Sequence, residues 1–255
     1  MVFVTTKKVV FEKMQERGTL CLTVTGHTGS GKSSYAIKTL AQLHGKLRVE
    51  ELPDGGKDLI LEEPDWDAWK RWLVFKPEDF LKHLQEAAAV DRQLPALVWD
   101  DAGAWANKYM WYTPVAQKIA SWLNTARTAY ACMMFTTPDE EDLFVAIRNF
   151  KDQHLAPVRK YTQDEWRREV NVYEKWKSLD GKKRGVVQVY TDRFNCRLPD
   201  AVFEEYRRVR KEYTKMLVDE IERSMNEHEL RERELGERAI RLLKARGYTD
   251  GGAEV

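Results

Sequence analysis

The 255-residue sequence has little cysteine and no long apolar run. Its three cysteines, Cys21, Cys132 and Cys196, are widely spaced and odd in number, which argues against a disulfide framework. No stretch approaches the roughly 18 apolar residues of a membrane-spanning helix. The N-terminal residues also lack the apolar core of a signal peptide. We therefore expect a cytoplasmic protein without a membrane partner.

Net charge is nearly absent as well, at +1. An anion-binding surface must therefore come from local segregation of charge rather than from the molecule as a whole. The five histidines show no paired spacing with cysteine, so no zinc site is predicted. Hydrophobic residues make up 43% of the chain, which is enough for a folded protein rather than a disordered one.

Short apolar segments alternate with helical patterns over the first 150 residues. The expected strands are 19–25, 72–75, 96–99 and 130–135, and the expected helices are 33–43, 78–89, 115–125 and 140–150. Residues 45–65 are interpreted as a loop-rich insertion because of their proline and glycine residues. Nearly continuous apolar strands between helices predict an α/β fold of three layers, with a mainly parallel central sheet.

The pattern changes beyond residue 150. Two further strands are expected at 155–161 and 185–190, as a candidate pair, with a charged helix at 163–177 between them. From residue 198 onward the sequence is mostly helical. Three parts are therefore expected: a core at 1–160, a basic strand and helix extension at 161–197 that completes or flanks the sheet, and a long charged helical segment at 198–255.

The strongest motif is Gly26-His-Thr-Gly-Ser-Gly-Lys-Ser33, which fits the P-loop pattern between a strand and a helix. Its glycines let successive backbone N–H groups point at phosphate oxygens. Lys32 is expected on the β- and γ-phosphates and the Ser33 hydroxyl on Mg²⁺, so ATP and Mg²⁺ are the expected cofactors. The predicted nucleotide-binding residues are Gly26, His27, Thr28, Gly29, Ser30, Gly31, Lys32, Ser33 and Ser34.

A second motif, Leu97-Val-Trp-Asp100-Asp101, places two acids at the end of an apolar strand. This is the Walker B pattern, and it brings a carboxylate to the sheet edge where open α/β sheets bind ligands. Asp100 is expected to hold Mg²⁺, and Asp101 to polarise the attacking water. Thr136 and Thr137 follow the next strand, where a polar residue can orient that water; either threonine fits, and we favour Thr137.

The order of these elements over residues 18–160 resembles the additional-strand class of P-loop ATPases. Within that class, the chain is similar to the AAA+ group of the replication initiator DnaA and the helicase loader DnaC. Similar compact ATPases are carried by archaeal viruses and plasmids. The resemblance implies that Arg148 reaches the ATP of a neighbouring subunit in a ring or filament. The group's helical lid has no recognisable counterpart here, which keeps the FtsK and HerA motor class open.

Residues 148–184 contain eleven Lys or Arg and six Asp or Glu, and Lys182-Lys183-Arg184 has the pattern of a basic turn. Such charges, interleaved with aromatics, can bind nucleic acid, although an aromatic face packed on the core fits the pattern too. Our main hypothesis is a Mg²⁺-dependent ATPase that assembles and acts on DNA in replication initiation or helicase loading. The alternatives are a DNA-translocating or packaging motor, and an ATP-gated module that binds a replication protein and hydrolyses little.

Overall fold

The computed structural model describes residues 5–51, 57–90, 92–108, 113–123, 128–150, 153–178 and 184–245. The chain divides into two compact units, Met1–Val202 and Phe203–Val255. The first unit contains the sheet and the P-loop motif. Most of the second consists of the long helix α7 (Asp200–Ala245), which confirms a helical extension at the C-terminus.

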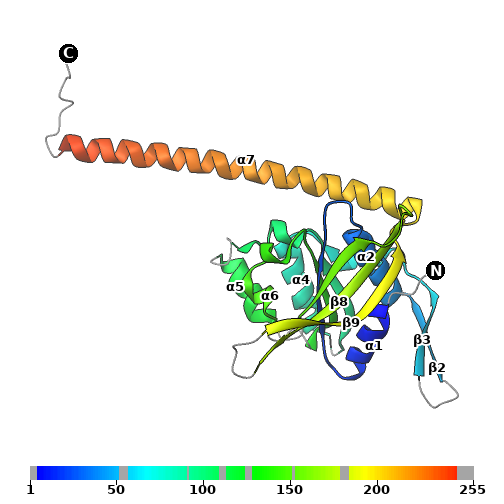
Figure 1. Cartoon of the computed structure of the whole chain (residues 1–255). Coiled ribbons are helices and arrows are strands. Elements are labelled where there is room, and N and C mark those ends of the chain that lie inside the picture. The colour runs from blue at the N-terminus through cyan, green and yellow to red at the C-terminus, as the bar shows by residue number, and fades with distance from the viewer. Residues whose placement is uncertain are drawn as a thin grey trace. The chain divides into compact units, whose positions relative to one another are not determined.

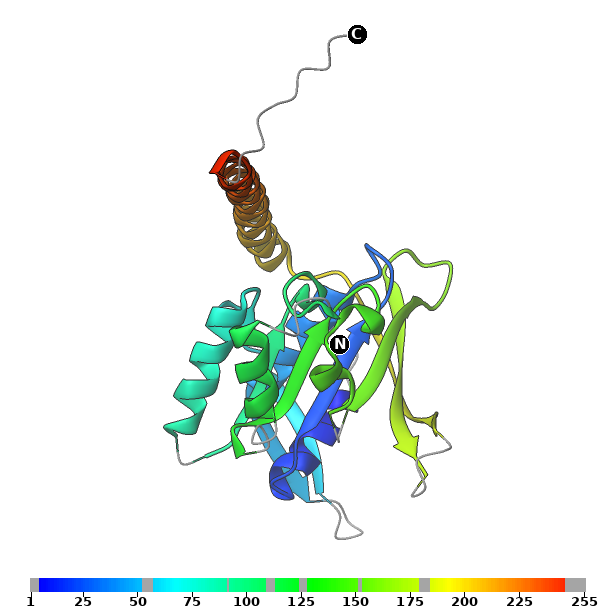
Figure 2. The ribbon, with the colours of Figure 1, turned by 90° about the vertical axis from the view of Figure 1, so that its left-hand side faces the viewer.

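A seven-stranded sheet organises the first unit, in the order β4-β5-β6-β1-β7-β8-β9. Its first five strands are parallel, and the last two are antiparallel. The strands are β1 (Leu20–Thr25), β4 (Leu73–Val74), β5 (Leu94–Trp99), β6 (Tyr130–Thr136), β7 (Gln153–Lys160), β8 (Arg167–Lys177) and β9 (Arg184–Asn195). Figure 2 shows this sheet with α4 in cyan at one end and the β8–β9 hairpin in yellow-green at the other.

Helices cover both faces of the parallel strands. On one face, Leu97, Trp99, Met133 and Phe135 pack with the helices α4, α5 and α6 in a continuous apolar core. The helices α1 and α2 contact the strands on the other face. The helix bounds are α1 (Thr5–Gln15), α2 (Lys32–Leu43), α3 (Ala68–Trp72), α4 (Pro77–Ala88), α5 (Pro114–Leu123) and α6 (Val145–Arg148). The first unit therefore has the expected three-layer α/β fold with a mainly parallel central sheet.

Helix α2, which carries the P-loop lysine, is tied to the far strand β9 by a buried polar cluster. The Tyr35 hydroxyl donates to Asp192 Oδ2 at 2.6 Å, and both the backbone N–H and the hydroxyl of Thr6 donate to that same oxygen. Burial and the Asp192 carboxylate raise the pKa of Tyr35 well above its usual value, so the phenol stays protonated as a donor. These contacts join α1, α2 and β9 in one unit.

The structure corrects the prediction for residues 163–177, which are not helical. Most of this stretch is strand β8, where Val170 and Val172 are buried on one face and Glu169, Asn171 and Tyr173 alternate with them as partly exposed residues. This alternation has the period of a strand. The high charge content of the segment led to its interpretation as an exposed helix. The expected pairing of 155–161 with 185–190 is wrong for the same reason, because β8 lies between β7 and β9.

Two smaller predictions also differ from the structure. The segment 45–65 forms a separate antiparallel hairpin, β2 (Lys46–Glu51) and β3 (Lys57–Glu63), rather than a loop (Figure 1). The expected helix at 140–150 is reduced to a 3₁₀ turn (Glu140–Asp142) and the single turn of α6. In that segment, the Asp139 carboxylate caps the turn by accepting a hydrogen bond from Glu141 N.

Candidate functional site

The P-loop motif forms a tight loop between β1 and α2. Gly26, Gly29 and Gly31 have φ angles of 142°, 78° and 100°, in the region that favours glycine. Space also excludes a side chain at Gly26, where a Cβ would lie 2.9 Å from the Val158 carbonyl oxygen. At Gly31 the space is tight, because a Cβ would lie 3.1 Å from Cys196 Cβ. The loop and the start of α2 form the kind of N–H cradle that binds phosphate.

Lys32 lies across this loop and is 9% exposed. Its Nζ donates to the carbonyl oxygens of Gly26 at 2.7 Å and His27 at 3.2 Å. The ammonium is therefore held over the loop by weak neutral acceptors. A phosphate oxygen bound there would be a stronger, charged acceptor for the same group.

The two acids after β5 have different surroundings. Asp100 is fully buried, and its Oδ1 accepts hydrogen bonds from Ser33 Oγ at 3.0 Å and from Thr136 Oγ1. A hydroxyl and a carboxylate at this separation form the all-oxygen donor set that suits Mg²⁺, so both predicted metal-binding residues fit the ion. No group of three or more His, Cys, Asp or Glu side chains capable of holding a metal occurs in the parts of the chain that the structure describes.

Asp101, the next residue, is partly exposed and adopts the left-handed conformation, with φ at 51°. Its backbone N–H donates to Thr136 Oγ1 at 2.8 Å. A non-glycine residue in this conformation is uncommon and costs free energy, although aspartate adopts it more readily than most. Strain of this kind is concentrated at functional sites, which agrees with the role predicted for Asp101.

The structure separates the two candidate threonines. Thr136 joins Asp100 to Asp101, whereas the Thr137 hydroxyl donates to the Asp139 carbonyl at 2.9 Å and lies against Gly103. Both are fully buried. Thr136 is thus the threonine that contacts the predicted site residues. The predicted role of Thr137 stays a prediction, and among the described residues no hydrogen bond joins its side chain to Asp100 or Asp101.

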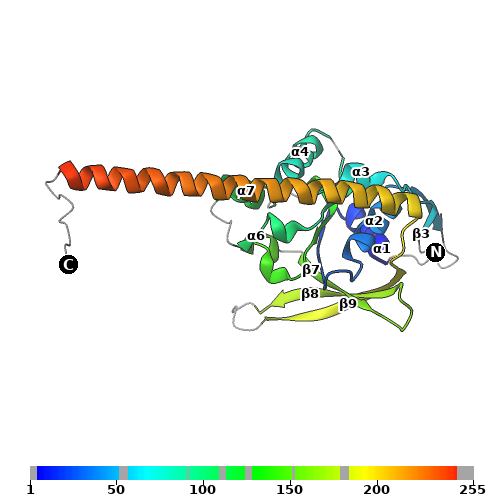
Figure 3. The same ribbon diagram turned by 90° about the horizontal axis from the view of Figure 1, so that it is seen from above.

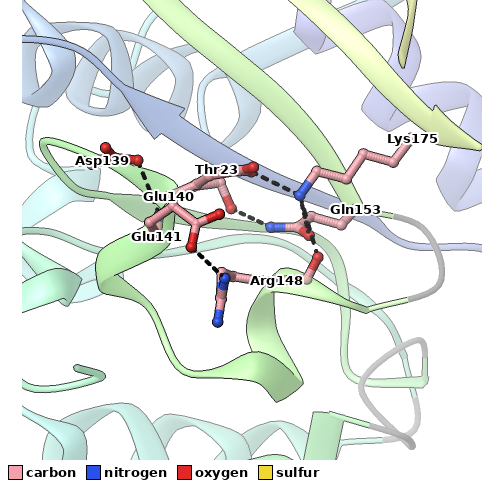
Figure 4. A network of polar contacts seen from close by, with 7 residues as sticks. All are labelled: Thr23, Asp139, Glu140, Glu141, Arg148, Gln153 and Lys175. Atoms are coloured by element: carbon pink, nitrogen blue, oxygen red, sulfur yellow. Dashed lines mark hydrogen bonds and ion pairs between the residues drawn. The ribbon is translucent and has the colours of Figure 1, made fainter. Parts of the chain in front are cut away.

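Arg148 belongs to a separate network at the end of α6 (Figure 4). Its guanidinium donates to Glu141 Oε2 at 2.9 Å, and its own carbonyl accepts from Lys175 Nζ at 3.4 Å. Lys175 also pairs with Glu140 at 2.7 Å and donates to Gln153, which in turn donates to the buried Thr23. This network connects the segment after β6 with β1, β7 and β8, away from the contacts of Lys32 and Asp100.

One residue at the P-loop was not found from the sequence. Arg168, at the start of β8, donates from Nε to the Ser30 carbonyl at 2.8 Å and from a terminal nitrogen to the Glu165 carbonyl at 2.6 Å. Because β8 is antiparallel to β7, it begins at the edge where the parallel strands end. No local pattern marks Arg168; only the correct strand order brings it to the loop.

Some of the basic turn lies outside the described residues. The structure describes Arg184 at the start of β9, but not Lys182 or Lys183. Nearby, Trp176 on β8 is 45% exposed and packs against Gly185, and Val186 and Val187 are more than half exposed. Figure 3 shows β8 and β9 on the opposite side of the first unit from α4.

No protein-family model matches the chain. The uncharacterized protein B-251 of Sulfolobus spindle-shape virus 1 is 28% identical over 201 residues, which are 77% of this chain and 76% of that protein. The uncharacterized protein ORF286 of Acidianus two-tailed virus is 28% identical over 164 residues, 63% of this chain but only half of that protein. Both of these relatives are viral proteins.

Two solved structures are more distant. The N-terminal domain of zonular occludens toxin from Neisseria meningitidis is 12% identical, with a TM-score of 0.41 over 73% of this chain and 98% of that one. The genome packaging NTPase B204 of Sulfolobus turreted icosahedral virus 2, in complex with ATP-gammaS, is 14% identical, with a TM-score of 0.36 over 69% of this chain and all of that one.

Among the described residues, no helix is long and apolar enough to cross a membrane.

The hydrogen bonds of the two threonines lead to a direct comparison of two variants. Thr136→Val removes a donor to the buried Asp100 carboxylate, so we expect the free energy of unfolding to fall by about 2–3 kcal/mol. Thr137→Val removes only a bond to a backbone carbonyl, and about 1 kcal/mol is expected. Urea denaturation of both variants measures the difference. A Thr137 variant that is the less stable of the two would show that Thr136 does not hold the site together.

Proposed function

We propose that this protein is a Mg²⁺-dependent ATP-binding and ATP-hydrolysing enzyme that assembles and acts on DNA. The proposal rests on the hydrogen bonds that join Asp100 to Ser33 and Thr136, at the end of a P-loop whose three glycines have positive φ angles. These bonds join the helix after β1 to the ends of β5 and β6, so they fix the phosphate loop against both predicted acids.

Each residue then has a defined part in hydrolysis. The loop N–H groups and Lys32 bind the phosphates. Ser33 and Asp100 would hold a Mg²⁺ ion, which would supply positive charge against the phosphate oxygens. Asp101 orients a water whose oxygen bonds to the γ-phosphorus as the bond to the bridging oxygen breaks. ADP and inorganic phosphate leave, and the proton of the water passes through Asp101 to the solvent.

Lys32 provides the test of nucleotide binding. Lys32→Ala removes a charge-assisted bond to phosphate, so the affinity for Mg–ATP is expected to fall about ten- to a hundredfold. Titration calorimetry with the full chain measures this. Lys8→Ala, which removes an exposed lysine of α1, is the matched control for the loss of one positive charge. Unchanged affinity in Lys32→Ala would refute the phosphate site.

The proposal that the protein assembles rests on Arg148. Within one chain, Lys32 is the cation that the proposed site supplies to the phosphates, beside Asp100 and Asp101. In related reactions, an arginine from a neighbouring subunit is a common second cation. Arg148 is 22% exposed at its side chain and pairs with Glu141, which is 65% exposed. Because the Glu141 end of the pair is exposed to water, the pair contributes little to stability, and Arg148 can exchange it for a phosphate of another subunit.

A mixing experiment tests this role. Arg148→Ala is expected to bind ATP as the unaltered chain does but to lose about 10³–10⁵ in turnover. Mixing it with Lys32→Ala should restore part of the activity, because a mixed interface has one intact P-loop and one intact arginine. Turnover that is independent of protein concentration, with no rescue at any ratio, would make Arg148 a structural residue.

The proposal that the protein acts on DNA rests on the charge excess of residues 148–184 and on the β8–β9 hairpin that carries it. The exposed Trp176 offers a ring on which a base can stack, next to the basic turn. DNA-stimulated ATP turnover would favour the translocating or packaging motor. ATP-dependent assembly on DNA without such stimulation would favour replication initiation or helicase loading. ATP binding without DNA-stimulated turnover and without assembly on DNA would favour the interaction module.

The basic turn has its own test. Replacing Lys182, Lys183 and Arg184 with Glu should weaken duplex DNA binding and reduce the slope of log affinity against log salt by about 0.9 for each phosphate that the turn no longer neutralises. The matched control replaces three exposed cations of α7, Arg207, Arg208 and Lys211, with Glu. Fluorescence anisotropy over a salt series measures both. Equal slopes in the turn variant and the unaltered chain would exclude the turn from DNA binding.

A further inference from the structure

A cavity of about 310 Å³ lies beside helix α2. Its lining includes Lys38, Trp66, Asn195, Arg197, Leu198 and Pro199. We call it the α2 pocket. The volume is at the lower end of the range in which proteins bind small ligands, roughly 300–1,000 Å³. Apolar and aromatic side chains with a few polar groups are also the usual lining of such sites.

The pocket lies farther along α2 than the phosphate loop, and Lys38 and Gln42 line it from that helix. Lys38 follows Lys32 by six residues on the same helix, which is about 9 Å along the axis. From the other side, Cys196 lies against Gly31, the last glycine of the loop, and its chain neighbours Asn195 and Arg197 line the pocket. A ligand bound with phosphates in the loop could therefore extend into the pocket within the length of one nucleotide.

The strand order is also consistent with a nucleotide that runs from the P-loop towards the α2 pocket. Asp100 follows β5, on one side of the P-loop strand β1, whereas the pocket is bounded by the end of β9, on the other side. The site predicted for Mg²⁺ and the attacking water thus lies on the β5 side. The remaining side, towards β9, is where the rest of a bound nucleotide has room.

The lining has the chemistry of a base-binding site. Trp66 is half-buried and offers an aromatic ring, with Lys38 Nζ 5.6 Å from its centroid. Asn195 Oδ1 accepts from Arg197 N at 2.8 Å, which orients its amide nitrogen as a donor. Burial lowers the pKa of Lys38, since the pocket wall shields its ammonium from water. Leu198 and Pro199 complete an apolar surface that suits a planar ring better than a phosphate.

We propose that the α2 pocket binds the base and ribose of the nucleotide whose phosphates occupy the P-loop, with Trp66 stacking on the base. This inference rests on the proposed function, because it requires a nucleotide in the loop. The α2 pocket would be the surface by which the protein distinguishes a nucleotide from a polyphosphate without base or ribose.

Two ligands separate this inference from the proposed function: Mg–ATP, and magnesium tripolyphosphate, which lacks base and ribose. Trp66→Ala is expected to bind Mg–ATP about ten- to a hundredfold more weakly, because the stacking of the base is removed. Its affinity for tripolyphosphate should stay that of the unaltered chain. Trp66→Phe, which keeps a ring, should recover most of the loss. Trp122→Ala, on helix α5, is the control and should change neither affinity.

Asn195→Ala provides a second variant that does not depend on how well Trp66→Ala folds. It removes a donor to the base and should weaken Mg–ATP binding severalfold while leaving tripolyphosphate unchanged. If both variants bind Mg–ATP as tightly as the unaltered chain while Lys32→Ala weakens both ligands, the inference is wrong and the proposed function stands. An equal loss for both ligands in Trp66→Ala and Asn195→Ala would also overturn it. If Lys32→Ala weakens neither ligand, the proposed function itself fails.

Discussion

The arrangement of the site depends on the buried carboxylate of Asp100. A buried charge is costly unless donors surround it, and here the hydroxyls of Ser33 and Thr136 both donate to Oδ1. Those donors come from α2 and β6, while the carboxylate follows β5. One oxygen therefore fixes the relative positions of three elements, and the P-loop and the strained Asp101 are placed as a consequence. Thr136 extends the same constraint to Asp101 by accepting its backbone N–H.

The antiparallel half of the sheet supports the phosphate loop from the other side. Arg168 holds the Ser30 carbonyl, Cys196 packs on Gly31, and the Asp192 carboxylate accepts from Tyr35 on α2. Lys175, nearer the far end of β8, joins the network around Glu140. Strand β8 thus contacts the P-loop at one end and the segment after β6 towards the other.

The sequence predicted the parts of the site that depend on local pattern. A glycine-rich loop between an apolar strand and a helix, and acids after another apolar strand, both have short-range signals, and the structure brings Ser33 and Asp100 together as expected. Residues chosen by tertiary contacts could not be predicted in this way. Thr136 and Thr137 are equivalent in sequence, and only the register of β6 against β1 and β5 distinguishes them. Arg168 was missed because its segment was interpreted as a helix, which removed it from the sheet edge.

A structure of the protein with Mg²⁺ and a non-hydrolysable ATP analogue would test directly whether this loop binds nucleotide. The phosphates are expected in the loop between Gly26 and Ser33, with Lys32 Nζ moved from the Gly26 carbonyl to a phosphate oxygen. The metal is expected at Ser33 and Asp100. A nucleotide bound elsewhere, with Lys32 still on the Gly26 carbonyl and Ser33 still donating to Asp100, would contradict this expectation.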